Sequence, residues 1–130
     1  MDDSAPRLLP LLNVRDGRAA LAFYRAAFGL EERFRVEDPS GDLVATVGLG
    51  TMEFWIADES PEHGNPSPET LGGASARMLL VVADPDAAFA RALAAGATEV
   101  WPVEEQHGWR TGRLRDPFGH HWEITRTPQS

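Results

Sequence analysis

The sequence repeats at an interval of about 70 residues, and this internal repeat constrains the fold more than any other feature. Asp16 and Asp84 each stand at a helix N-cap, directly before an apolar stripe of helical period. Gly29 and Gly96 each follow that stripe, in the position where helices commonly end. One strand pattern precedes each helix and three follow it. The repeat therefore predicts two tandem βαβββ modules.

The two modules are expected at about 7–57 and 76–127, joined by a proline- and glycine-rich linker at about 58–75. The expected elements are strand 7–14, helix 16–28 and strands 31–37, 43–49 and 51–57, then strand 76–82, helix 85–95 and strands 99–104, 111–115 and 121–126. Alternation in these strands predicts sheets with one face on a helix and the other face open. The predicted fold class is α+β, one domain over 1–130, with sheets curved around a cleft.

Composition and charge exclude several classes of partner and chemistry. The formal net charge of −8 argues against nucleic acid and anionic membrane surfaces, and no apolar run is long enough to span a bilayer. The absence of cysteine removes disulfides and thiolate metal sites and favours a cytoplasmic location. All 12 basic residues are arginine, which excludes Schiff-base chemistry by a lysine. The predicted partner is a small molecule.

The fourth strand of each module carries a candidate site residue. Glu53 and Trp55 share one face of 51–57, and His121 and Glu123 share one face of 121–126. Two such faces brought together would enclose a cleft with a glutamate on each wall. The alternative is that both glutamates form ordinary cross-strand ion pairs with arginines, for which Arg77, Arg113 and Arg115 are available. The sequence favours neither the ligand-contacting role nor the ion pairs for these two glutamates.

The four tryptophans provide a second signal. Trp122 alternates with the glutamate face and is expected in the core, whereas Trp55 is expected in the cleft. Trp101 and Trp109 flank 102–108, a segment that is predicted to be a loop and a possible lid over the cleft. Trp109 is expected either to contact the ligand or to lie in an interface between protein chains. Aromatic walls with carboxylates suit a flat or cationic ligand.

These features resemble the vicinal oxygen chelate superfamily, in its glyoxalase/bleomycin-resistance branch. The resemblance runs from about Leu8 to Thr127 and depends on Asp16, Ala22-Phe23-Tyr24, Phe28-Gly29, Arg113-Leu114-Arg115-Asp116-Pro117-Phe118-Gly119-His120 and Trp122-Glu123. It implies paired modules, a homodimer whose clefts use both chains, and, in metal-dependent members, ligands from the first and fourth strands. Glu53 and Glu123 match the fourth-strand ligands. The first-strand equivalents fall near Leu9 or Pro10 and near Arg77 or Met78, which are not ligands for a divalent cation.

The sequence therefore predicts a metal-independent protein that sequesters an aromatic or cationic, antibiotic-like molecule in a dimer cleft, with no cofactor and no catalytic residue. The predicted ligand-binding residues are Glu53, Trp55, Arg77, Trp109, Arg113, His121 and Glu123. The alternative is an enzyme of the same superfamily, a lyase, isomerase or dioxygenase, that uses Mn, Ni, Zn or Fe held by Glu53 and Glu123. A metal-free enzyme with one of these glutamates as a base is a third possibility.

Overall fold

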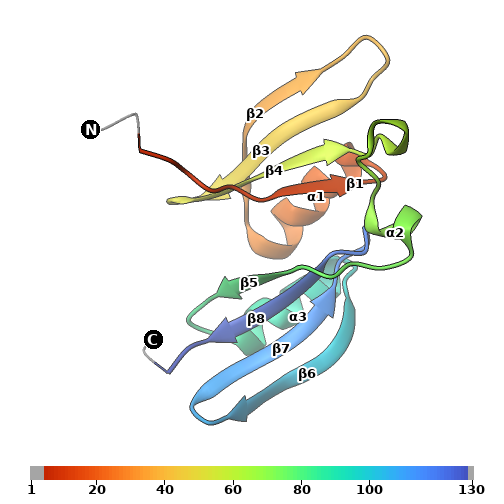
Figure 1. Cartoon of the computed structure of the whole chain (residues 1–130). Helices are drawn as coiled ribbons and strands as arrows, with labels where there is room; N and C mark the ends of the chain where they lie inside the picture. Colours follow the sequence, from red (N-terminus) through yellow and green to blue (C-terminus); the bar gives the residue numbers. More distant parts are fainter. Residues whose placement is uncertain (1–4, 129–130) are drawn as a thin grey trace.

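Two four-stranded sheets, each with its own helix, make up the computed structural model, which describes residues 5–128 (Figure 1). The elements are β1 Leu11–Val14, α1 Gly17–Phe28, β2 Glu31–Glu37, β3 Leu43–Leu49, β4 Met52–Asp58, η1 Pro61–His63, α2 Pro68–Leu71, β5 Arg77–Val81, α3 Pro85–Ala95, β6 Thr98–Gln106, β7 Trp109–Arg115 and β8 His121–Arg126. The strand orders are β1-β4-β3-β2 and β5-β8-β7-β6. In both sheets the first and fourth strands are parallel and the other neighbours antiparallel. The predicted α+β fold of tandem βαβββ modules is confirmed.

The two main helices begin and end where their capping residues predict. The carboxylates of Asp16 and Asp84 accept from the backbone N–H groups of Ala19 and Ala87, both at 3.1 Å. Each bond satisfies a donor that has no partner inside its helix. Gly29 ends α1 with a φ of +70°, which a residue with a side chain rarely adopts.

Strand β1 is shorter than the predicted range 7–14. Only Leu11 to Val14 pair with β4, in parallel register from Leu11 opposite Trp55 to Val14 opposite Asp58. Pro10 has no N–H to donate to a ladder, and its carbonyl instead accepts from Trp55 N at 2.9 Å. The proline therefore sets the start of the strand.

The predicted lid over 102–108 is wrong, because most of that segment belongs to β6. The strand continues to Gln106, and only His107 and Gly108 form the turn into β7. Pro102 is tolerated because β6 is an edge strand with register shifts on both sides of Trp101. Trp101 and Trp109 thus lie on two strands of one hairpin.

The linker also contains more structure than predicted. It includes the short helix η1 and the one-turn helix α2. The Glu59 carboxylate accepts from Ser67 N at 2.8 Å and from Thr70 Oγ1 at 2.7 Å. These bonds, the Ser67 backbone bond foremost, hold the pKa of Glu59 below its usual value. The carboxylate fixes α2 against the end of β4.

The two modules share one core, in which α1 packs against α3. Tyr24 of α1 is fully buried, and its hydroxyl donates to Asp116 of the β7–β8 turn. Its ring lies against Trp122 of β8, with centroids 5.5 Å apart. The prediction that Trp122 lies in the core is confirmed, since it is 3% exposed. The open face of each sheet is the face opposite to this shared core.

Residues 5–128 include no helix with the length and apolar character needed to cross a membrane.

Candidate functional site

The open face of module one carries Glu53 and Trp55. The Glu53 side chain is 20% exposed and pairs with Arg7 at 3.3 Å and with Arg33 at 3.6 Å. The indole of Trp55 meets the ring of Phe34 edge to face, with centroids 6.0 Å apart. This face therefore presents an aromatic pair beside a carboxylate that two arginines already compensate.

The open face of module two is arranged in rungs across three strands. In one rung His121 stands between Arg115 of β7 and Arg77 of β5. In the next rung Glu123 stands between Arg113 and Leu79. Because side chains two residues apart on a strand share a face, all of these side chains lie on the open side. The predicted residues Arg77, Arg113, His121 and Glu123 are thus neighbours.

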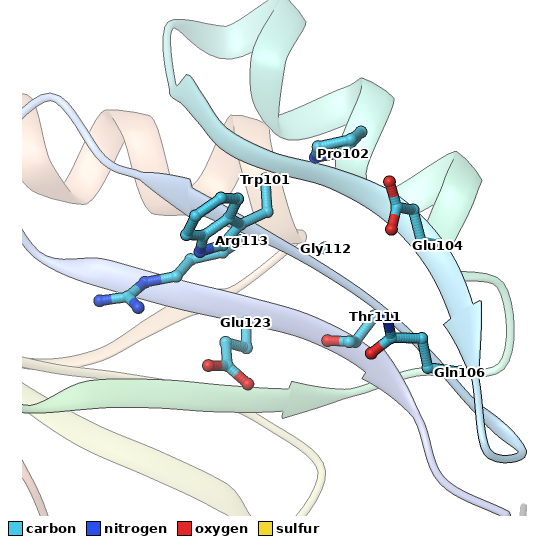
Figure 2. Close-up of a pocket in the computed structure, with 8 residues that line it drawn as sticks. All are labelled: Trp101, Pro102, Glu104, Gln106, Thr111, Gly112, Arg113 and Glu123. Atoms are coloured by element: carbon cyan, nitrogen blue, oxygen red, sulfur yellow. The ribbon is translucent and has the colours of Figure 1, made fainter.

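A pocket of about 320 Å³ opens on this face (Figure 2). Its lining residues are Trp101, Pro102, Glu104, Gln106, Thr111, Gly112, Arg113 and Glu123. Trp101 is 62% exposed and pairs in register with Arg113 across the β6–β7 hairpin. Figure 2 shows its indole beside the Arg113 side chain, with the Glu123 carboxylate on the neighbouring strand. An exposed indole beside charges of both signs is a typical setting for a flat polar ligand.

Thr111 contributes an unsatisfied polar group to the pocket. Its Oγ1 atom is buried and has no hydrogen-bond partner among the described residues. A hydroxyl that is withdrawn from water and unpaired costs about 1–3 kcal/mol, unless a ligand or ordered water meets it. The pocket wall therefore holds an unused donor and acceptor.

Glu123 and His121 both have arginine partners. Arg77 Nε donates to Glu123, whose side chain is 22% exposed. Arg113 Nε donates to Nδ1 of His121 at 3.2 Å. Burial lowers the pKa of His121 below its usual value, and the charges of Arg113 and Arg115 lower it further. Both effects favour the neutral form of His121.

The donor set does not fit a divalent metal ion. Residues 5–128 contain no cluster of three or more histidine, aspartate, glutamate or cysteine side chains suited to hold one. Arg77 is one of the two residues expected near the first-strand ligand position, and it pairs with Glu123, the matching glutamate of its module. A guanidinium at that point carries the same charge as the cation and competes for the same carboxylate.

The structure separates the predicted site residues into three groups. Arg113 and Glu123 line the pocket, and Arg77 and His121 flank it on the same face. Glu53 and Trp55 lie on the open face of module one, where their ion pairs and ring contact are with residues of that module. Trp109 is 41% exposed at the hairpin end and does not line the pocket.

Six of the eight residues that line the pocket were not predicted as ligand-binding, and neither was Arg115, which lies on the same face. The sequence predicts Trp101 at the edge of a lid. In the structure, its pairing with Arg113 makes it part of the pocket wall. Thr111 and Arg115 alternate with Arg113 along β7, and this period of two was a signal available in the sequence. No sequence pattern indicates that the Thr111 hydroxyl lacks a hydrogen-bond partner.

The family model described as "Glyoxalase-like domain" matches residues 11–125. The chain belongs to this family. Its fold is that of the glyoxalase/bleomycin resistance/dioxygenase superfamily. The uncharacterized protein Rv0887c of Mycobacterium tuberculosis is 42% identical over 124 residues, which cover 92% of this chain and 73% of that protein.

Two solved structures show the same fold. The gene product At5g48480 of Arabidopsis thaliana is 27% identical and has a TM-score of 0.71, with 92% of this chain and 96% of that chain covered. A glyoxalase/bleomycin resistance protein/dioxygenase family enzyme of Burkholderia phytofirmans is 22% identical and has a TM-score of 0.70, with 90% and 94% covered. The glyoxalase-like fold extends over nearly the whole chain.

Proposed function

We propose that this glyoxalase-like protein binds a small, flat aromatic molecule without a metal ion and without turning it over. The pocket on the open face of module two carries the proposal. Its exposed indole, Trp101, offers a stacking surface, and Arg113, Glu123 and the unpaired Thr111 hydroxyl offer polar contacts. Aromatic burial supplies affinity, and the polar groups select the ligand.

The ion pairs favour an aromatic ligand over a purely cationic one. A cation approaching Glu123 has to displace Arg77, and a cation approaching Glu53 has to displace Arg7 and Arg33. Stacking on Trp101 requires no such exchange. Sequestration of an antibiotic-like compound requires only that the protein bind the molecule and shield it from solvent, and stacking on Trp101 is sufficient for this.

A second copy of the chain completes the cleft in this proposal. Leu11, Phe34 and Val36 are each 51% exposed, and Leu79 and Val81 are each 53% exposed. The strand registers place all five on open faces. Apolar surface of this kind favours burial against another protein surface, here module one of one protomer against module two of its partner. Analytical ultracentrifugation should detect a dimer, and a monomer at micromolar concentration would refute this part of the proposal.

The binding test compares two tryptophans of the same hairpin. Polycyclic compounds, neutral and cationic, should produce saturable chemical-shift changes in two-dimensional amide NMR spectra. Trp101→Ala should weaken the affinity about tenfold, since one stacked aromatic contact contributes about 1 kcal/mol or more. Trp109→Ala is the matched control, because it removes an exposed indole outside the pocket and should change the affinity little. Equal effects of the two variants, or no response to the panel, would contradict the proposal.

The competing proposal is a metal-dependent enzyme; the Burkholderia neighbour is named as an enzyme. It requires a divalent cation to displace Arg77 from Glu123. Metal analysis after incubation with Mn²⁺, Ni²⁺ and Zn²⁺ discriminates the two. About one tightly held ion per site would support the enzyme and overturn metal-independent binding.

A further inference from the structure

A row of basic side chains crosses the open face of module two at the end nearest the β7–β8 turn. Arg115, His121 and Arg77 form one rung, and Arg113 lies in the next rung. Glu123 is the one carboxylate within these two rungs. Three guanidinium groups against one carboxylate give a locally positive surface, although the whole chain has a formal charge of −8. Local potential of this sign attracts anions.

One of the three arginines remains available to a ligand. Arg77 is paired with Glu123, and Arg113 donates to His121. Arg115 is exposed and makes neither an ion pair nor a side-chain hydrogen bond with the described residues. Its guanidinium can present two parallel N–H groups to an oxyanion, the geometry in which arginine binds carboxylate and phosphate most strongly.

The bond from Arg113 also sets the tautomer of His121. A guanidinium nitrogen is always a donor, so Nδ1 of His121 has to accept at 3.2 Å. A neutral imidazole that accepts at Nδ1 carries its hydrogen on Nε2. His121 therefore offers a donor, as Arg115 does.

Arg115 and His121 share a second cavity, of about 350 Å³, beside the Trp101 pocket. Gly72, Gly73 and Gly119 are among its lining residues, and a Cβ at Gly72 or Gly73 would meet no atom within 4 Å, so the backbone is accessible at those two positions. Glu69 also lines it and is paired with Arg15 at 3.1 Å. The two cavities adjoin, because Arg113 lines the first and bonds to His121, which lines the second.

We propose that this basic row is the subsite for an oxyanion on the ligand, so that the ligand is an aromatic acid. The inference rests on the proposed function, since it takes the ring to lie against Trp101. Successive rungs on one face are about 7 Å apart along a strand. An aromatic ring at the Trp101–Glu123 rung therefore reaches Arg115 and His121 through a spacer of one or two carbons. The acceptor is a carboxylate or a phosphate-type group.

The experiment compares ligands that share a ring and differ in charge. Naphthylacetate, naphthyl phosphate, naphthylacetamide and naphthylethylamine are titrated into the full chain by two-dimensional amide NMR. At least one of the two anions should bind about tenfold more tightly than the neutral amide, as expected for a charge-assisted hydrogen bond. Their relative affinities distinguish a carboxylate site from a phosphate site. Added salt should weaken the anions and leave the amide unchanged.

Arg115→Gln provides the residue-level test, with Arg25→Gln as the matched control. Both substitutions remove one exposed positive charge, but Arg25 lies on α1, on the core side of the other sheet. Arg115→Gln should remove most of the advantage of the anion over the amide and leave amide binding intact. Arg25→Gln should change neither. Nitrogen chemical shifts of the His121 ring should report the hydrogen on Nε2.

The outcomes distinguish failure of this inference alone from failure of both proposals. If the amide binds and the acids bind no better, or if Arg115→Gln has no effect on the acids, the oxyanion subsite is refuted and the aromatic site stands. If the amine binds most tightly, the site is cation-selective and the subsite is likewise refuted. If none of the four probes binds, both proposals fail together.

Discussion

Removing one hydroxyl group from the core should test how the two modules are held together. Tyr24→Phe is expected to lower the free energy of unfolding by about 2 kcal/mol. The Tyr24 hydroxyl donates to Asp116 Oδ2, and both residues are buried, at 0% and 2% exposure. A hydrogen bond to a charged group contributes about 1.5–3 kcal/mol when its loss leaves the charge short of a donor.

The estimate stays moderate because Asp116 keeps three other donors. Trp122 Nε1 donates to the same oxygen at 3.0 Å, and the backbone N–H groups of Phe118 and His120 donate to the other at 2.9 and 3.0 Å. The phenylalanine ring retains the contacts of Tyr24 with Phe54 and Trp122. No cavity larger than one oxygen atom forms, so packing adds little to the loss.

Urea unfolding followed by tryptophan fluorescence measures the change, since Trp122 lies in the core. Asp116→Asn and the double variant complete the cycle. Both single substitutions remove the same bond. The sum of their losses in unfolding free energy should therefore exceed the loss in the double variant by about 1 kcal/mol or more. A loss below about 0.5 kcal/mol for Tyr24→Phe, or strictly additive effects, would refute the assignment of this bond as a major tie between modules.

Three further predictions follow from single residues. Burial, and then the charge of Asp116, raise the pKa of Tyr24 well above its usual 10.0. Because the pKa is higher in the folded than in the unfolded protein, the contribution of the neutral Tyr24 to folding stability is complete below about pH 10. That contribution declines as the pH rises toward the folded-state pKa. Tyr24 is the one tyrosine of the chain, so phenolate absorbance reports it directly, and a titration midpoint near 10.0 in a protein with native circular dichroism would contradict this. Gly112→Ala should destabilise by about 1–3 kcal/mol in thermal unfolding, since its Cβ would lie 2.8 Å from a methyl group of Val103, whereas Gly73→Ala meets no atom within 4 Å and should not. Asp84→Ala removes the N-cap bond of α3 and should cost about 1 kcal/mol by chemical denaturation; an unchanged midpoint would show that the cap contributes nothing.

Much of the fold could be predicted because each module carries complete local signals. Asp16, Asp84, Gly29 and Gly96 mark the helix ends, and those positions depend on backbone groups within one turn. Strand alternation likewise separated Trp122 and Ile124 from His121 and Glu123, since a period of two leaves little freedom once one face is buried. Two of the errors lie at prolines: strand 7–14 was predicted to run through Pro10, directly after which β1 in fact starts, and the segment that begins at Pro102 was predicted to be a loop. Pro102 lies within an edge strand, a location that depends on the order of strands in the sheet.

The candidate site was only partly within reach of the sequence. Local pattern alone determined which side chains share a face, including the pairs Glu53 with Trp55 and His121 with Glu123. Tertiary structure decided which of them interact: Arg77 pairs with Glu123 on a strand that is distant in sequence, and Arg113 bonds to His121 across the β7–β8 hairpin. It also turned the open faces of the two modules away from their shared core, so that the pocket is built from module two alone in one chain. The physical reason is that local propensity acts over a few residues, whereas register, ion pairing and cavity shape depend on which strands become neighbours when the core is buried.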